Sequence, residues 1–214
     1  CERKPSGFPF AFNNPPQRQN CKIKTQKLIL QFWKQLGEKA QRDCFDKLKN
    51  YRRDETMKIG MLTSGGDCQG LNAALRGVAK ALYQEFGTAV TIYGIRDGYR
   101  GLIEGDYHPM EPQDFSDILT RGGTILGTSR QPFKTMQQAE ENEATKLEKM
   151  LDTCRRARFD CLVILGGNGT HKTANLLSEH GIPVVTLPKT IDNDLWGTQV
   201  TFGFQSAMNI AVEV

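Results

Sequence analysis

The chain has 214 residues, of which 24% are charged and 38% hydrophobic, and its formal net charge is +4 at pH 7. No stretch approaches the roughly 18 consecutive apolar residues of a membrane-spanning helix, so we expect no membrane partner. The positive charge belongs to one end: residues 1–56 hold 13 Lys and Arg against 6 Asp and Glu, whereas residues 57–214 hold 15 against 18. Nucleic-acid binding by residues 57–214 is therefore not indicated.

Residues 1–56 differ in character from the rest of the chain. Residues 5–20 are rich in Pro, Asn and Gln without apolar periodicity, which favours disorder. Apolar residues recur at helical spacing over about 25–50, so a basic amphipathic helix at a partner or membrane surface is a second interpretation. We favour a third, in which residues 1–56 are translated upstream DNA, because Met57 begins the first predicted strand without a linker, as a start codon would.

From Met57 onward, short apolar runs alternate with amphipathic stretches. The apolar runs predict strands near 58–63, 89–95, 160–165 and 182–187. The amphipathic stretches predict helices near 72–86, 113–120, 137–157 and 171–180, with a further helix at 205–214. Strands that alternate with helices are typical of a parallel sheet with right-handed crossovers, so the predicted fold class is α/β.

Glycine-rich polar loops follow two of these strands, at residues 63–70 (TSGGDCQG) and 166–170 (GGNGT). Glycine lets backbone N–H groups approach an anion closely, and a following helix N-terminus adds partial positive charge. Neither loop has the Walker A spacing or the dinucleotide-binding fingerprint. Either loop alone could serve only the packing of a strand against a helix.

A third polar segment, residues 188–194 (PKTIDND), follows the strand predicted at 182–187. It combines two carboxylates, an amide, a hydroxyl and an ammonium. By itself it could be a turn with an Asx cap. Ligands of open α/β sheets bind at the carboxyl ends of strands, so three polar loops at such ends predict a phosphate-handling cleft.

Four segments together resemble the 6-phosphofructokinase family: residues 62–67 with 71–74, residues 121–130, residues 166–170 and residues 188–194. The similarity runs from about residue 57 to 214 and leaves residues 1–56 without a counterpart. It covers about the first half of a typical catalytic chain of the family. The resemblance implies a three-layer, Rossmann-like domain with a parallel sheet, here truncated, so that the 214-residue chain alone would be inactive.

The resemblance also implies roles for individual residues. Asp192 would accept the proton of the sugar 1-hydroxyl, Thr190 would hold that acceptor, and Asp194 would support the transition state or the magnesium environment. The nucleotide phosphates would be held by Gly65, Gly66, Arg130, Gly167, Asn168, Gly169 and Thr170. The substrates would be ATP and fructose 6-phosphate, with Mg²⁺ as the metal, in a cytoplasmic and homo-oligomeric enzyme of glycolysis.

Asn168 departs from the family pattern, in which this position usually holds an acid associated with magnesium. An amide oxygen can still ligate Mg²⁺ or one of its waters, but without charge. We favour a subfamily that relies on other oxygens over a weakened, nucleotide-binding regulatory relative. Lipid and NAD kinases have a similar glycine loop but would not explain the Asp192 motif.

Two markers of the phosphoryl donor disagree. Gly169 resembles the ATP-using pattern, whereas Lys189 occurs in pyrophosphate users and in some ATP users. A carboxylate at 169 would crowd and repel the α-phosphate of a nucleotide, and glycine leaves room for it. We therefore expect ATP, with a pyrophosphate-dependent phosphofructokinase as the alternative.

The six cysteines show no CxxC spacing, which favours free thiols over zinc ligands or disulfides. Cys68 lies within the first glycine loop, where thiol reagents could reach it.

Overall fold

A computed structural model describes residues 56–138 and 144–213. The three interpretations of residues 1–56 therefore fall outside the described residues, as does the part of the helix predicted at 137–157 that lies within residues 139–143.

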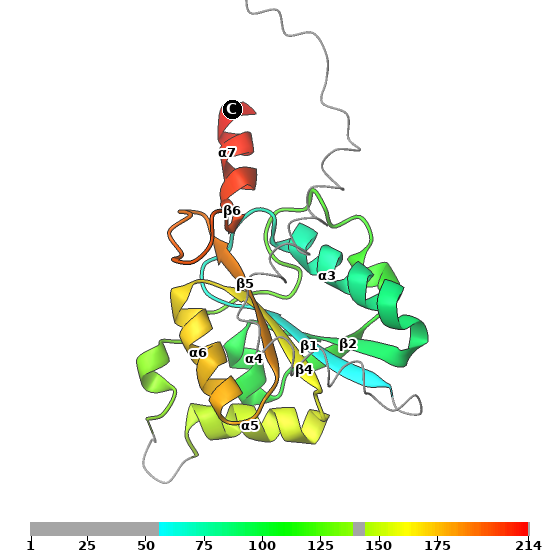
Figure 1. Ribbon diagram of the computed structural model, residues 1–214, viewed down its shortest axis with the longest axis vertical. Coiled ribbons are helices and arrows are strands. Elements are labelled where there is room, and N and C mark those ends of the chain that lie inside the picture. Colours follow the sequence, from blue (N-terminus) through cyan, green and yellow to red (C-terminus); the bar gives the residue numbers. More distant parts are fainter. Residues whose placement is uncertain (1–55, 139–143, 214) are drawn as a thin grey trace, which may run out of the picture.

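The centre of the domain is a six-stranded sheet with the order β3-β2-β1-β4-β5-β6 (Figure 1). Its strands are β1 (Met57–Thr63), β2 (Val90–Ile95), β3 (Tyr107–Met110), β4 (Cys161–Gly166), β5 (Val184–Thr190) and β6 (Phe202–Gly203). All neighbours pair in parallel except β3, which is antiparallel to β2. The four predicted strands and their parallel pairing are confirmed, while β3 and β6 were not predicted.

Helices cover both faces of this sheet. The α-helices are α3 (Leu71–Phe86), α4 (Tyr99–Glu104), α5 (Lys146–Ala157), α6 (Asn168–Glu179) and α7 (Phe204–Glu213). Short 3₁₀ helices are η1 (Gly87–Ala89), η2 (Pro112–Phe115) and η3 (Phe133–Thr135). One core cluster joins α3 to one face of the sheet, and a second joins α4, α5 and α6 to the other. The predicted three-layer α/β fold is confirmed.

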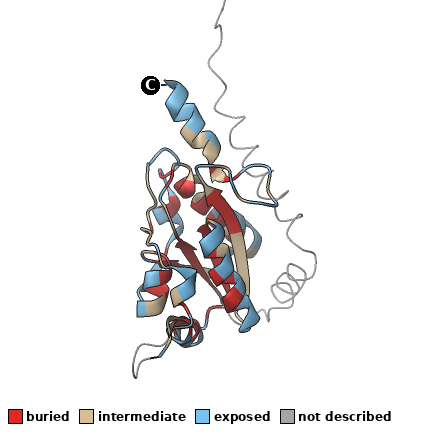
Figure 2. Ribbon diagram, turned by 90° about the vertical axis from the view of Figure 1, so that its left-hand side faces the viewer, coloured by how far each residue is buried: buried red, intermediate tan, exposed pale blue. Residues whose placement is uncertain are grey.

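Strand β4 shows why the sheet lies in the middle. All six of its residues are buried. Figure 2 shows buried residues at the centre of the domain and exposed helix surfaces around them. Cys161, Val163 and Leu165 belong to the cluster under α3, whereas Leu162 and Ile164 belong to the opposite cluster. Because successive side chains of a strand point to opposite faces, a run without polar residues has to be covered on both sides.

Four predicted boundaries were wrong. Helix α6, expected near 171–180, begins three residues earlier, at Asn168. The helix expected near 113–120 is only the 3₁₀ turn η2, after which Asp117 adopts a left-handed conformation (φ 55°). Helix α5 begins after Thr145, whose hydroxyl accepts the Glu148 N–H while the Glu148 carboxylate accepts the Thr145 N–H. This reciprocal capping fixes the start of the helix. Strand β5 is shifted toward the C-terminus and includes Lys189 and Thr190.

Helix α7 confirms the helix predicted at 205–214 and projects away from the rest of the domain (Figure 1). It contains no buried residue, and Met208, Ile210 and Val212 are exposed. None of the helices in the described part of the chain is long and apolar enough to cross a membrane.

Candidate active site

The two glycine loops meet where the connectivity of the sheet diverges. Strands β1 and β4 are neighbours, but α3 leads from β1 to β2 on one side, and α6 leads from β4 to β5 on the other. The helices α3 and α6 belong to opposite core clusters. Loops that leave adjacent strand ends in opposite directions leave a crevice between them, which is the usual ligand site of open α/β sheets.

The loop after β1 is held by residues 121–130, which cross over it. The Gly65 N–H donates to the Ser129 carbonyl at 3.1 Å, and the Thr128 hydroxyl donates to the Gly65 carbonyl at 2.8 Å. Gly65 has a φ of 91°, a conformation that favours glycine. A Cβ atom on Gly66 would lie 3.5 Å from the Arg130 guanidinium. The structure therefore brings Gly65, Gly66 and Arg130 together, as predicted.

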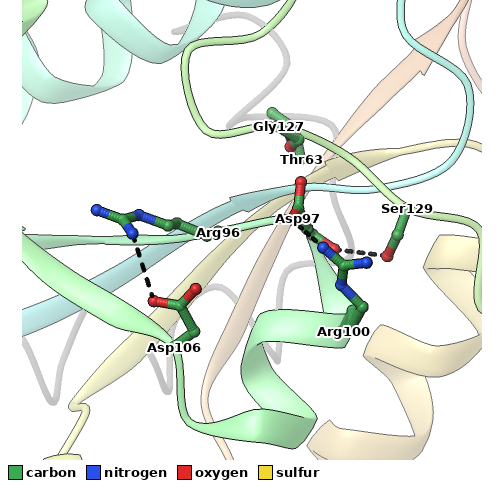
Figure 3. A network of polar contacts seen from close by, with 7 residues as sticks. All are labelled: Thr63, Arg96, Asp97, Arg100, Asp106, Gly127 and Ser129. Carbon is green, nitrogen blue, oxygen red and sulfur yellow. Dashed lines mark hydrogen bonds and ion pairs between the residues drawn. The ribbon is translucent and has the colours of Figure 1, made fainter.

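Figure 3 shows how the end of β2 supports this segment. The Asp97 N–H donates to the Leu126 carbonyl at 2.9 Å, and the Ser129 hydroxyl donates to the Asp97 carbonyl. Asp97 has a left-handed conformation (φ 51°) and forms an ion pair with Arg100. The contacts of Asp97 with residues 126 and 129 were not predicted from the sequence, although the dipeptide Asp97-Gly98 is a turn signal.

Lys189 reaches the same loop from β5. Its side chain is only 4% exposed, and its ammonium donates a hydrogen bond to the Gly66 carbonyl. Burial lowers the pKa of Lys189, although the nearby Cys68 and Asp67 oppose that shift. Lys189 and Arg130 thus place two basic groups beside one glycine loop, an arrangement that suits an anion.

Cys68 is buried with 6% exposure, so the expectation that thiol reagents could reach it was wrong. Burial raises the pKa of its thiol, which keeps the group protonated. The other cysteines of the described residues, Cys154 and Cys161, are also buried.

The second glycine loop forms the start of helix α6. Gly167 is the N-cap and has no capping side chain, so the first N–H groups of the helix are open to a ligand. Asn168 and Gly169 are exposed, and a Cβ atom on Gly169 would meet nothing within 4 Å. The structure therefore leaves space at position 169.

Thr170 points inward rather than into solvent. Its side chain packs beneath Gly166, and it is 6% exposed. Its carbonyl accepts a hydrogen bond of 2.8 Å from the hydroxyl of the buried Tyr99, which comes from α4 and was not predicted to belong to the site. Burial raises the pKa of Tyr99, so its phenol stays protonated and can donate.

His171, the next residue of α6, adds no positive charge at neutral pH. Burial lowers its pKa from the ordinary value near 6.5, and a backbone hydrogen bond to Gly166 opposes this only in part.

The acidic motif begins at the carboxyl end of β5. The Thr190 hydroxyl donates to the Asp194 carboxylate at 3.0 Å and accepts the Asp192 N–H at 3.2 Å. Asp192 and Asp194 themselves are exposed. The motif thus forms a turn, as one interpretation of the sequence had it, and this turn exposes two carboxylates to solvent.

Comparison with known proteins identifies the family. The model of the family described as Phosphofructokinase matches residues 58–214, most of the chain. The chain belongs to the phosphofructokinase family. It is 58% identical over 165 residues to an ATP-dependent 6-phosphofructokinase of Spirochaeta thermophila, covering 76% of this chain and 44% of that one. It is 44% identical over 158 residues to ATP-dependent 6-phosphofructokinase 3 of Bacteroides thetaiotaomicron, covering 73% and 46%. The chain therefore spans somewhat less than half the length of these relatives.

Solved phosphofructokinases have the same fold. The T-state enzyme of Pichia pastoris matches with a TM-score of 0.65 and 29% identity, over 76% of this chain and 18% of that one. A pyrophosphate-dependent phosphofructokinase of Marinobacter aquaeolei matches with a TM-score of 0.60 over 73% of this chain and 40% of that one. At 22% identity, this second likeness concerns the fold alone. The predicted resemblance to the family is confirmed.

Proposed function

We propose that this sequence, completed with its native downstream sequence to the length of its relatives (the completed enzyme), transfers the γ-phosphoryl group of ATP to the 1-hydroxyl of fructose 6-phosphate. The observation that supports this best is that two glycine loops meet at the ends of the neighbouring strands β1 and β4. Lys189 lies beside the first of these loops, and the Asp192 motif follows Lys189 at the end of β5. The family's relatives named ATP-dependent 6-phosphofructokinase support the choice of reaction.

The nucleotide phosphates are bound between the two glycine loops. Open N–H groups at the start of α6 and the guanidinium of Arg130 supply the positive side of this site. Gly167, Asn168 and Gly169 approach the phosphates with their backbone. Thr170 supports the loop from beneath, since its carbonyl and side chain are already packed against Tyr99 and Gly166.

Asp192 acts as the general base. Phosphoryl transfer needs an aligned donor and acceptor and a group near the attacking hydroxyl that accepts its proton. The exposed Asp192 carboxylate takes this proton as the sugar oxygen bonds to the terminal phosphorus and the bond to ADP breaks. Thr190 orients the acceptor and the Asp194 carboxylate, to which its hydroxyl donates.

Magnesium fits this site as an ion held mainly by phosphate oxygens. Within residues 56–138 and 144–213, no group of three or more His, Cys, Asp or Glu could hold a metal. Mg²⁺ commonly keeps several waters and binds one or two protein groups together with substrate phosphates. The exposed amide of Asn168 would supply one such oxygen. When bound, the ion neutralises charge on the phosphates.

Lys189 favours a second candidate function, pyrophosphate-dependent phosphorylation of the same sugar. Its ammonium lies at the Gly66 carbonyl, beside the proposed phosphate site. Pyrophosphate is compact and carries more negative charge per atom than a nucleotide, so it would be attracted more strongly by this ammonium. The open space at Gly169 supports ATP, because the α-phosphate needs that room. We expect the completed enzyme to be a cytoplasmic homo-oligomer, as the family resemblance implies.

Steady-state assays of the completed enzyme with ATP and with pyrophosphate test this proposal, together with Asp192→Asn. The substitution should lower kcat by about 10²–10⁴-fold, because it removes the general base, while the KM for ATP changes little. A variant that keeps most of its kcat would remove Asp192 from this role. A higher kcat/KM with pyrophosphate would reverse the donor. Nucleotide binding without turnover would indicate a regulatory relative instead.

A further inference from the structure

The two carboxylates of the proposed site lie on a segment that the sheet does not hold directly. Residues 191–201 leave the sheet after β5 and return to it as β6, without helix or strand between them. The segment is largely exposed, with Ile191 at 46% and Trp196 at 102% exposure. A catalytic group on such a segment needs other contacts to keep it in place.

Two residues outside the proposed catalytic set supply those contacts. The Asn193 side-chain oxygen accepts the Thr201 N–H at 2.9 Å, and its amide donates to the Gln199 carbonyl at 3.2 Å. The Thr201 hydroxyl donates to the Thr190 carbonyl at 2.7 Å and lies 3.3 Å from the Asn193 oxygen. Thr201 is 3% exposed, so solvent does not replace these bonds easily.

These contacts join three points of the chain: the last residue of β5, the middle of the acidic motif, and the residue before β6. Asp192 and Asp194 are the two neighbours of Asn193, one on each side. Asn193 has a left-handed backbone (φ 54°), which Asn tolerates better than most residues. This conformation places its side chain toward Thr201 instead of solvent.

We propose that Asn193 and Thr201 are positioning residues that hold the Asp192 carboxylate in its productive place. This inference rests on the proposed function, in which Asp192 is the general base. Displacing a reacting group by about 1 Å can lower a rate by about 10²-fold, so the effect belongs to kcat rather than to nucleotide binding. The hydrogen bonds of Asn193 and Thr201 go to Thr190, Gln199 and each other, not to the nucleotide loops after β1 and β4.

Thr201→Val tests this in the completed enzyme, because valine keeps the shape of threonine and removes the hydroxyl. We expect kcat to fall by about 10–100-fold with the KM for ATP within about twofold, and Thr201→Ser to restore most of the rate. Thr198→Val is the matched control, because the Thr198 hydroxyl bonds only the Val200 carbonyl, at 3.0 Å, within the exposed part of the segment. It should leave kcat unchanged.

Asn193→Gly provides a second variant in case Thr201→Val fails to fold. Glycine accepts the left-handed backbone, so this change removes the carboxamide with little strain. It should reproduce the loss of kcat. A kcat within twofold of the wild type in either folded variant, or an equal fall with Thr198→Val, would overturn the proposal.

Combining each change with Asp192→Asn separates this inference from the proposed function. If the two residues act through Asp192, adding Thr201→Val to Asp192→Asn should lower kcat by less than twofold further. A full additional loss would show that Thr201 acts by another route and would overturn the proposal. If Asp192→Asn alone retains kcat, the proposed role of Asp192 fails, and the inference that rests on it fails too.

Discussion

At the residue scale, position 169 bears on the proposed choice of donor. Gly169 lies exposed in the first turn of α6, and no heavy atom lies within 4 Å of where its Cβ would be. A side chain at this position would meet no neighbouring atom of the domain, so packing does not require glycine here. It leaves room in the proposed phosphate site, next to Asn168.

Gly169→Asp should raise the KM of the completed enzyme for ATP by about tenfold, since like charges at close range in a partly desolvated site oppose binding by about 1.4 kcal/mol. Gly169→Asn has the same size without the charge and separates crowding from repulsion. Steady-state kinetics and the melting temperature of both variants check this. An unchanged KM for ATP in Gly169→Asp would remove the argument for ATP from this position.

At the scale of elements, short α4 supports the site from beneath. It carries Tyr99, which bonds the Thr170 carbonyl, and it joins β2 to the antiparallel β3. Gly101 in its middle leaves no room for a side chain, because a Cβ there would overlap the Arg96 carbonyl oxygen and lie 3.0 Å from the Asp106 oxygen. Backbone atoms cannot move aside as a flexible side chain can.

We expect Gly101→Ala to lower the free energy of unfolding by about 1–3 kcal/mol, as overpacking does. Alanine would otherwise stabilise a helix by about 1 kcal/mol relative to glycine, so a net loss requires the overlap to dominate. Gly122→Ala is the control, because a Cβ there meets nothing within 4 Å. Denaturant unfolding should show no such loss for it. Equal stability of Gly101→Ala and the wild type would show that α4 can shift.

At the scale of the whole molecule, the described residues pack around one sheet whose first strand is β1. Among the described residues, the members of both core clusters lie between Met57 and Leu187, with partly buried neighbours up to Phe202. The first strand is buried from Met57 onward, apart from Lys58. The family match begins at the same place, at residue 58.

A completed enzyme that begins at Met57 should therefore fold and retain its activity without residues 1–56. Its melting temperature and kcat should equal those of the chain that keeps them. Loss of solubility or of turnover on removing residues 1–56 would show that this segment belongs to the functional protein.

Much of the fold and of the candidate site could be predicted from local sequence patterns. The apolar runs of β1, β2, β4 and β5 and the three polar loops after β1, β4 and β5 could be recognised because each is contained in a few consecutive residues. The boundaries that failed depended on local competition: the Thr145 cap against helical periodicity, and the left-handed Asp117 against continuation of a helix.

The sequence by itself thus determined the fold class, the family and the residues that carry the proposed chemistry. Only the tertiary structure decided that Lys189 contacts Gly66, that the Thr170 carbonyl accepts from Tyr99, and that Cys68 is buried. The two hydrogen bonds join residues far apart in the chain, and Lys189 and Gly66 are separated by 123 positions. They follow from the placing of β1 beside β4 and β4 beside β5, which no local pattern encodes, because pairing between distant strands is set by the packing of the whole sheet.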